Sequence, residues 1–201
     1  FKRGAGGPPT DSLNRGNYNG KAWIPGEADV SIRKGWFYHE EEDKTVKSGK
    51  KLFDLYLKNV GRGGNFLLNV PPNRQGLFAP ADSIALMDFK KIKDAAFKNN
   101  LFKNARILRT NNSIEVHLKE AVEINAIQLM EAISMGQRVV TFEISGSNDV
   151  KKFETFAKGT TVGHKRIITF PTQKLKYFRI YISESKATPM ISEVSGYLFA
   201  N

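Results

Sequence analysis

Two carboxylates lie among aromatic residues in the stretch GKAWIPGEADVSIRKGWFYHE, which covers residues 20–40. Glu27 and Asp29 follow a Pro-Gly pair and stand between Trp23 and Trp36. A carboxylic acid in apolar surroundings keeps its proton to a higher pH, because burial penalises the charged form. A carboxyl group of this kind can act as a general acid near neutral pH.

Each of these residues also has an ordinary structural interpretation. Glu27 could cap a backbone turn, Asp29 could accept hydrogen bonds from loop amides, and both tryptophans could be core residues. The three histidines are His39, His117 and His164, and none has a partner at metal-ligand spacing. The chain has no cysteine, so a zinc-thiolate site and a thiol nucleophile are excluded. We expect no metal site and no cofactor.

The composition predicts a globular chain with a basic surface. The 201 residues are 40% hydrophobic, and the net charge is +11, which is enough apolar content for a packed core. Residues 1–100 hold 17 basic and 11 acidic side chains, and residues 101–201 hold 14 and 9. A surplus spread this evenly disfavours a nucleic-acid interface, which usually clusters its cations. No apolar run reaches the roughly 18 residues of a membrane span.

Residues 27–98 alternate between strand and helix patterns. Residues 28–32 read as a short strand, and residues 39–61 as a helix with an acidic start and Gly61 as its C-cap. The apolar run NFLLNV at 65–70 is typical of a strand buried on both faces. A second helix follows, capped by Asp82 or Ser83, with Ile84, Met87, Ile92 and Phe97 near one face. This alternation predicts parallel α/β units.

The pattern changes near residue 100. From Ile107 onward, short alternating strands are separated by the turn sequences GSND, KGTTVG and TPM, which is typical of an antiparallel β-sandwich. We therefore predict two domains, an α/β part over residues 1–98 and an all-β part over residues 99–201, with the boundary at about 98–106.

Several of these segments together resemble the C-terminal portion of the family 29 α-L-fucosidases. They are W-x-P-x-E-x-D-V-S-I with GWFYH, then LYLKNVGRGGNFLLNVPPNRQG and PADSIALM, and then EAISMGQRV, GTTVGHKRI and ATPMIS. The closest resemblance is to the subgroup that prefers α-1,3/1,4-linked fucose. It implies the last units of a (β/α)8-like barrel followed by a galactose-binding-like β-sandwich.

The resemblance also implies roles for particular residues. In a retaining glycosidase one carboxylate attacks the anomeric carbon and a second acts as acid and then base. The family segment maps the acid/base to Glu27. Arg15 resembles an arginine that contacts fucose, Trp36 and Trp23 are candidates for the aromatic wall, and Asp29 is expected to support Glu27. The implied substrate is a fucosylated oligosaccharide or glycoprotein glycan.

The chain departs from the family pattern at its beginning. The family nucleophile is an aspartate on an earlier strand, and Asp11 has no strand leading into it. We therefore expect the nucleophile and the first strands to be absent, the isolated chain to be inactive, and a missing N-terminal part of the catalytic domain to be its partner. The expected location is outside the cell or in the periplasm, although no signal sequence is visible.

Two other classes of function stay open. One is a non-catalytic carbohydrate-binding module, with Phe142, Phe153, Phe156 and Tyr177 as its platform, although alternating aromatics in a sandwich are more often core. The other is a structural domain that supports a barrel. Nucleic-acid binding would depend on charge alone.

Overall fold

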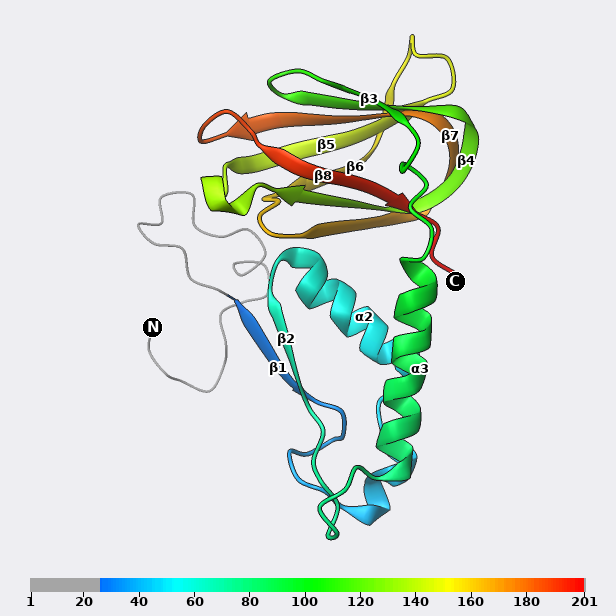
Figure 1. The fold of residues 1–201 in the computed structure, drawn as a ribbon, viewed down its shortest axis with the longest axis vertical. Coiled ribbons are helices and arrows are strands. Elements are labelled where there is room, and N and C mark those ends of the chain that lie inside the picture. The colour runs from blue at the N-terminus through cyan, green and yellow to red at the C-terminus, as the bar shows by residue number, and fades with distance from the viewer. Residues whose placement is uncertain (1–25, 201) are drawn as a thin grey trace.

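The computed structural model describes residues 26–200, which form a small α/β part and a larger β part (Figure 1). The α/β part contains two strands, β1 (Glu27–Ser31) and β2 (Asn65–Asn69), which pair in parallel. Helix α2 (Gly49–Asn59) connects them, and helix α3 (Pro80–Ala96) follows β2. The predicted strand–helix–strand–helix order and the parallel pairing are confirmed.

Helix α2 begins later than the acidic run predicted. Residues 40–45 form a separate 3₁₀ helix, η1 (Glu40–Thr45), and α2 starts at Gly49, where the Ser48 hydroxyl accepts a hydrogen bond from the amide of Lys51 at 3.3 Å. The predicted C-cap is also displaced. A short 3₁₀ helix, η2 (Val60–Arg62), extends the helix, and Gly63 adopts the left-handed conformation at φ 83°.

Gly49 is held against the backbone of α3. A Cβ atom at this position would lie 2.6 Å from the Phe89 amide nitrogen and 2.7 Å from the Asp88 carbonyl carbon. Helical backbone cannot yield as a flexible side chain can, so we expect Gly49→Ala to separate α2 from α3. The expected destabilisation is about 1–3 kcal/mol, measured by urea unfolding. Gly35 provides the contrast, because a Cβ there meets nothing within 4 Å and its backbone is not left-handed.

Helix α3 differs from the prediction at its first turn. Ala79 occupies the N-cap position and Pro80 the first helical position, so neither Asp82 nor Ser83 caps the helix. The face assignment was wrong for Ile84 and Met87, which are each 64% exposed. Ile92 and Phe97 instead pack in a cluster with Phe53.

The β part is an antiparallel sandwich in which two long strands take part in both layers (Figure 1). Its strands are β3 (Arg106–Arg109), β4 (Ser113–Glu131), β5 (Val139–Ser147), β6 (Glu154–Thr160), β7 (Arg166–Ser185) and β8 (Ile191–Tyr197). The order is β3-β4-β7-β5-β6, and β8 also pairs with β4. A short 3₁₀ helix, η3 (Ile133–Met135), precedes β5. The predicted antiparallel sandwich is confirmed, although β4 and β7, with 19 and 20 residues, are longer than the short strands predicted and contain register shifts.

An aromatic cluster joins the two parts. Phe53 of α2, Phe97 after α3, and Tyr197 and Phe199 at the end of the sandwich pack together. The ring centroids of Phe97 and Tyr197 lie 5.1 Å apart, and those of Phe97 and Phe199 lie 5.2 Å apart, both edge to face. Such pairs stabilise beyond the area that they bury, so the α/β part and the sandwich share one continuous interface.

A charged cluster on the sandwich predicts a pH dependence of stability. Hydrogen bonds from His117 and then from Arg179 hold the pKa of Glu115 below its ordinary value, at oxygen distances of 2.9 Å. A lowered folded-state pKa stabilises the fold above the ordinary pKa of glutamate, and this stability is lost as pH falls through the folded value. We expect Glu115→Gln to lose up to about 1 kcal/mol at neutral pH. Urea unfolding at neutral and acidic pH would contradict this if the difference persisted in acid.

Candidate functional site

Glu27 begins β1 and is exposed. Its carboxylate Oε2 accepts a hydrogen bond from the side-chain amide of Asn65 at 2.5 Å, and these two residues are register partners across the parallel pair. Both therefore lie at the amino end of their strands. Barrel enzymes carry catalytic groups at the other, carboxyl, end, so this position does not follow the usual barrel arrangement.

Trp36 lies at the opposite end of the strand pair. Its main-chain carbonyl accepts a hydrogen bond from the Asn69 side chain at 3.0 Å, and Asn69 is the register partner of Ser31, the last residue of β1. Ser31 is four residues along the strand from Glu27, a distance of about 13 Å. The structure therefore does not bring Glu27 and Trp36 together as an acid and its aromatic wall.

The other predicted site residues are placed less completely. Asp29 is exposed in the middle of β1, opposite Leu67. Arg15 and Trp23 lie outside the described residues. Leu67 itself is 48% exposed, so β2 is not covered on both faces by the part of the chain that the structure describes. The functional roles of these five residues, Glu27, Asp29, Arg15, Trp23 and Trp36, stay predictions.

A buried ion pair organises the carboxyl end of β1. The Arg33 guanidinium and the Asp82 carboxylate are both 0% exposed, and Nε and Nη2 of Arg33 each donate to Asp82 Oδ2 at 3.1 Å. Nη2 also donates to Asp43 Oδ1 at 2.7 Å, and Nη1 donates to the carbonyl of His39 at 3.0 Å. Burial would lower the pKa of Arg33, but its bonds to Asp43 and Asp82 outweigh it and raise the pKa.

Further polar contacts fix the loop from Ser31 to His39. The Lys47 ammonium donates to the carbonyls of Ser31 and Arg33 at 2.7 and 2.9 Å. The Ser31 hydroxyl donates to the carbonyl of Gly35 at 2.5 Å. The Tyr38 ring lies 4.7 Å from the Arg33 guanidinium carbon. These contacts fix the loop backbone, while the side chains of Trp36 and Phe37 are exposed.

The outward side chains belong to an apolar surface at the carboxyl ends of the two strands. Trp36 is 51% exposed and Phe37 is 78% exposed, and Leu77 and Phe78 of the loop after β2 are 62% and 59% exposed. Both loops lie near the amino end of α3 (Figure 1). Exposed apolar groups of this size usually contact a ligand or another protein surface. This end of the strand pair therefore presents exposed apolar side chains and is a candidate binding face.

Sequence reasoning missed the ion pair on which this face depends. Arg33 and Asp82 are 49 residues apart, and Asp82 was assigned to a helix cap instead. One signal in the sequence argued against Asp82 as a cap. Pro80 suits the first helical position, which places Asp82 inside the first turn of the helix. Nothing in the sequence identifies Arg33 as its partner.

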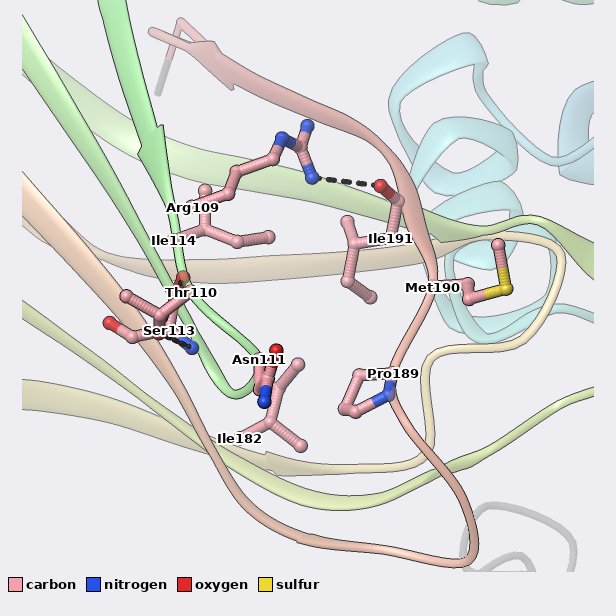
Figure 2. Close-up of a pocket in the computed structure, with 9 residues that line it drawn as sticks. All are labelled: Arg109, Thr110, Asn111, Ser113, Ile114, Ile182, Pro189, Met190 and Ile191. Carbon is pink, nitrogen blue, oxygen red and sulfur yellow. Dashed lines mark hydrogen bonds between the residues drawn. The ribbon is translucent and has the colours of Figure 1, made fainter.

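A separate pocket of about 210 Å³ lies in the sandwich, between the β3–β4 hairpin and the segment that leads into β8 (Figure 2). Ile114, Ile182 and Ile191 contribute an apolar wall, and Asn111 and Ser113 contribute polar groups. The Arg109 guanidinium is turned to the carbonyl of Ile191, to which Nη1 donates at 2.8 Å. None of the nine lining residues is aromatic, so the pocket has no ring for a sugar to stack on.

Residues 26–200 contain no group of three or more His, Cys, Asp or Glu side chains that could hold a metal ion. None of the described helices is long and apolar enough to cross a membrane.

Two parallel strands with their helices, joined to an antiparallel sandwich, define the end of a barrel domain followed by a galactose-binding-like domain. Comparison with known families agrees with this division. Residues 9–91 match the family model for α-L-fucosidase, and residues 94–194 match that for the F5/8 type C domain. Residues 94–194 therefore belong to the F5/8 type C domain family, and residues 9–91 are similar to the α-L-fucosidase family.

Individual relatives show the same relationship. The chain is 32% identical over 219 residues to α-L-fucosidase 1 of Arabidopsis thaliana, covering 91% of the chain and 42% of that protein. The structure of a glycoside hydrolase 29 family member from an unknown rumen bacterium is 34% identical, with a TM-score of 0.89, and covers 98% of the chain and 37% of that chain.

A third relative was solved with a sugar. The structure of a Ruminococcus gnavus GH29 fucosidase in complex with fucose is 26% identical, with a TM-score of 0.81 over 91% of the chain and 43% of that chain. The chain therefore spans less than half the length of each of these three relatives.

Proposed function

We propose that the chain is part of a retaining α-L-fucosidase that releases terminal fucose from glycans, with a preference for α-1,3/1,4 linkages, in a secreted or periplasmic protein. The observation that carries the proposal is the α-L-fucosidase family match over residues 9–91, together with the high structural similarity to GH29 proteins. The apolar face at the carboxyl ends of β1 and β2 supports it, because this is where barrel enzymes bind substrate.

Glu27 is proposed as the acid/base of this reaction. The sequence segment that contains Glu27 supports this role. The exposed position of Glu27 at the amino end of β1 does not support it, because barrel enzymes carry catalytic groups at the carboxyl end. The hydrogen bond from Asn65 gives Glu27 a competing structural role, in which it links the starts of two parallel strands. The two roles predict different kinetic effects of replacing Glu27.

Fucose release tests the function directly. A protein that contains this chain and the rest of its catalytic domain should release fucose from fucosylated oligosaccharides, and NMR should show the first-formed sugar with its anomeric configuration retained. An inverted first product would contradict the two-step mechanism. Failure to release fucose from any α-linked fucosylated glycan would contradict the function. The 201-residue chain alone is the control, and we expect no release from it.

The non-catalytic alternative is a sandwich that only binds carbohydrate. Its proposed platform is not exposed as one surface. Phe142 is 1% exposed in the core, Phe156 packs on Phe170 with ring centroids 4.6 Å apart, and Phe153 is covered by the Arg179 guanidinium at 3.9 Å. Because these rings are occupied by other side chains, they do not favour this alternative.

A further inference from the structure

Arg166 carries hydrogen-bond donors that the described protein leaves unused. It is the first residue of β7, where it pairs with Leu129. Its Nε and Nη1 atoms are both buried and have no hydrogen-bond partner. Buried guanidinium groups are almost always paired, because removing their charge and donors from water is unfavourable. An unused pair of donors at this depth therefore requires an explanation.

A second cation stands beside it. The η2 turn lies directly over the start of β7, since a Cβ atom at Gly61 would be 3.2 Å from Cβ of Ile167, and one at Gly63 would be 3.5 Å from the carbonyl oxygen of Lys165. This turn carries Arg62. Burial lowers the pKa of Arg166, and the charge of Arg62 lowers it further. No carboxylate among residues 26–200 is found to offset these two effects.

The two arginines lie where the α/β part meets the sandwich. Arg62 immediately precedes the Gly63–Gly64 turn into β2, and the amide of Asn65 donates to the carbonyl of Gly26 at 2.8 Å. Arg166 opens a strand of the sandwich. The donors therefore lie toward the amino end of the strand pair, where Glu27 also stands, and away from the loop that carries Trp36.

We propose that Arg166, assisted by Arg62, is the receptor for an acidic side chain from the part of the longer relatives that this chain does not span, and that this ion pair joins the barrel domain to its sandwich. An anion is favoured over a neutral acceptor because the buried donors of Arg166 have no partner and the positive charge of Arg62 acts on Arg166 from nearby. A carboxylate also gives charge-assisted hydrogen bonds to a guanidinium. The chain spans 42% of the length of its Arabidopsis relative, so a large partner surface of the same family exists to supply this group.

Sodium formate is the probe, because it is the smallest carboxylate and can enter a site left open in the 201-residue chain. We expect formate to raise the unfolding temperature of this chain by about 2–4 °C relative to sodium chloride at matched ionic strength. It should also shift the Nε–H NMR signal of Arg166 in a saturable way. Arg166→Met should abolish both effects, and Arg62→Gln should weaken them. Arg74→Gln removes an exposed arginine and should change neither.

Each other outcome overturns the proposal in a definite way. An equal response to chloride would show a general salt effect and no carboxylate site. If Arg166→Met unfolds at the same or a higher temperature and formate has no effect on the parent chain, Arg166 needs no anion. Asp11 is the only acidic residue before Gly26. If formate acts only on Asp11→Asn, the partner is Asp11 of this same chain, and the proposed link to another part of the protein is wrong.

Discussion

Replacing Arg33 by methionine is expected to destabilise the α/β part by about 3–5 kcal/mol. The substitution leaves Asp82 at 0% exposure with no cation, and Asp82 Oδ1 already lacks a hydrogen-bond partner. It also removes the donors to Asp43 and to the His39 carbonyl. Trp36 lies in the loop that follows β1, so its fluorescence during urea unfolding gives a signal from this part of the molecule.

The double variant separates the ion pair from simple packing. Arg33→Met with Asp82→Leu removes both charges together, and replacing a buried pair by apolar groups is often nearly neutral. We therefore expect the double variant to recover most of the stability lost by Arg33→Met. The exposed Lys90–Asp94 pair of α3 is the matched control, and Asp94→Asn should leave the unfolding midpoint unchanged within error. Additive losses in the double variant would mean that Arg33 acts through packing alone.

Substitution of Arg33 should also affect the candidate binding face. The Arg33 cluster and Asn69 fix the backbone that carries Trp36 and Phe37, so a variant that still folds should hold these rings less firmly. A less ordered platform weakens substrate binding by the entropy of ordering it again. In the intact protein, under the proposed function, we therefore expect Arg33→Lys, which keeps the charge but loses the planar fork, to raise KM more than it lowers kcat.

Local patterns predicted the elements of this fold better than their ends. The parallel pair was recoverable because Val30 and Ile32 alternate across the predicted strand at 28–32 and NFLLNV is a continuous apolar run. The sandwich strands were recoverable from their period of two. Alternation does not reveal where a strand bends, so the long strands β4 and β7 were each divided. The acidic run before α2 suited a helix start, but Ser48 caps the helix eight residues later than that run begins.

The candidate site was less predictable, because its geometry depends on contacts between distant residues. Glu27 and Trp36 are nine residues apart and were expected to share a pocket, yet β1 is extended and places them at opposite ends. In the sequence Arg33 is only one of many basic residues. Its structural role depends on ion pairs with Asp82 and Asp43, which lie in other elements. Contacts that span 49 residues cannot be read from a period of two or of 3.6.

Glu27→Gln in the intact protein is expected to reduce turnover of a natural, poorly activated fucoside by about 10²–10⁴-fold, and that of an activated aryl fucoside far less. The reason is that a general acid matters only when the leaving oxygen needs a proton. Loss of the acid/base should also remove the basic limb of the pH–rate profile. Comparing kcat/KM for the two substrate types at several pH values would provide the measurement.

Asn65→Ala is the control that gives this test its meaning. Asn65 donates a hydrogen bond to Glu27 across the start of the strand pair. Both Glu27→Gln and Asn65→Ala change this contact, but only Asn65→Ala keeps the carboxyl group of Glu27. If Glu27 is the acid/base, Asn65→Ala keeps the difference between the two substrates close to that of the parent enzyme. If Glu27 only links β1 to β2, both variants lose stability together and slow both substrates by the same modest factor. That second result would assign the acid/base role to a carboxylate at the carboxyl end of another barrel strand, which is where barrel enzymes carry catalytic groups.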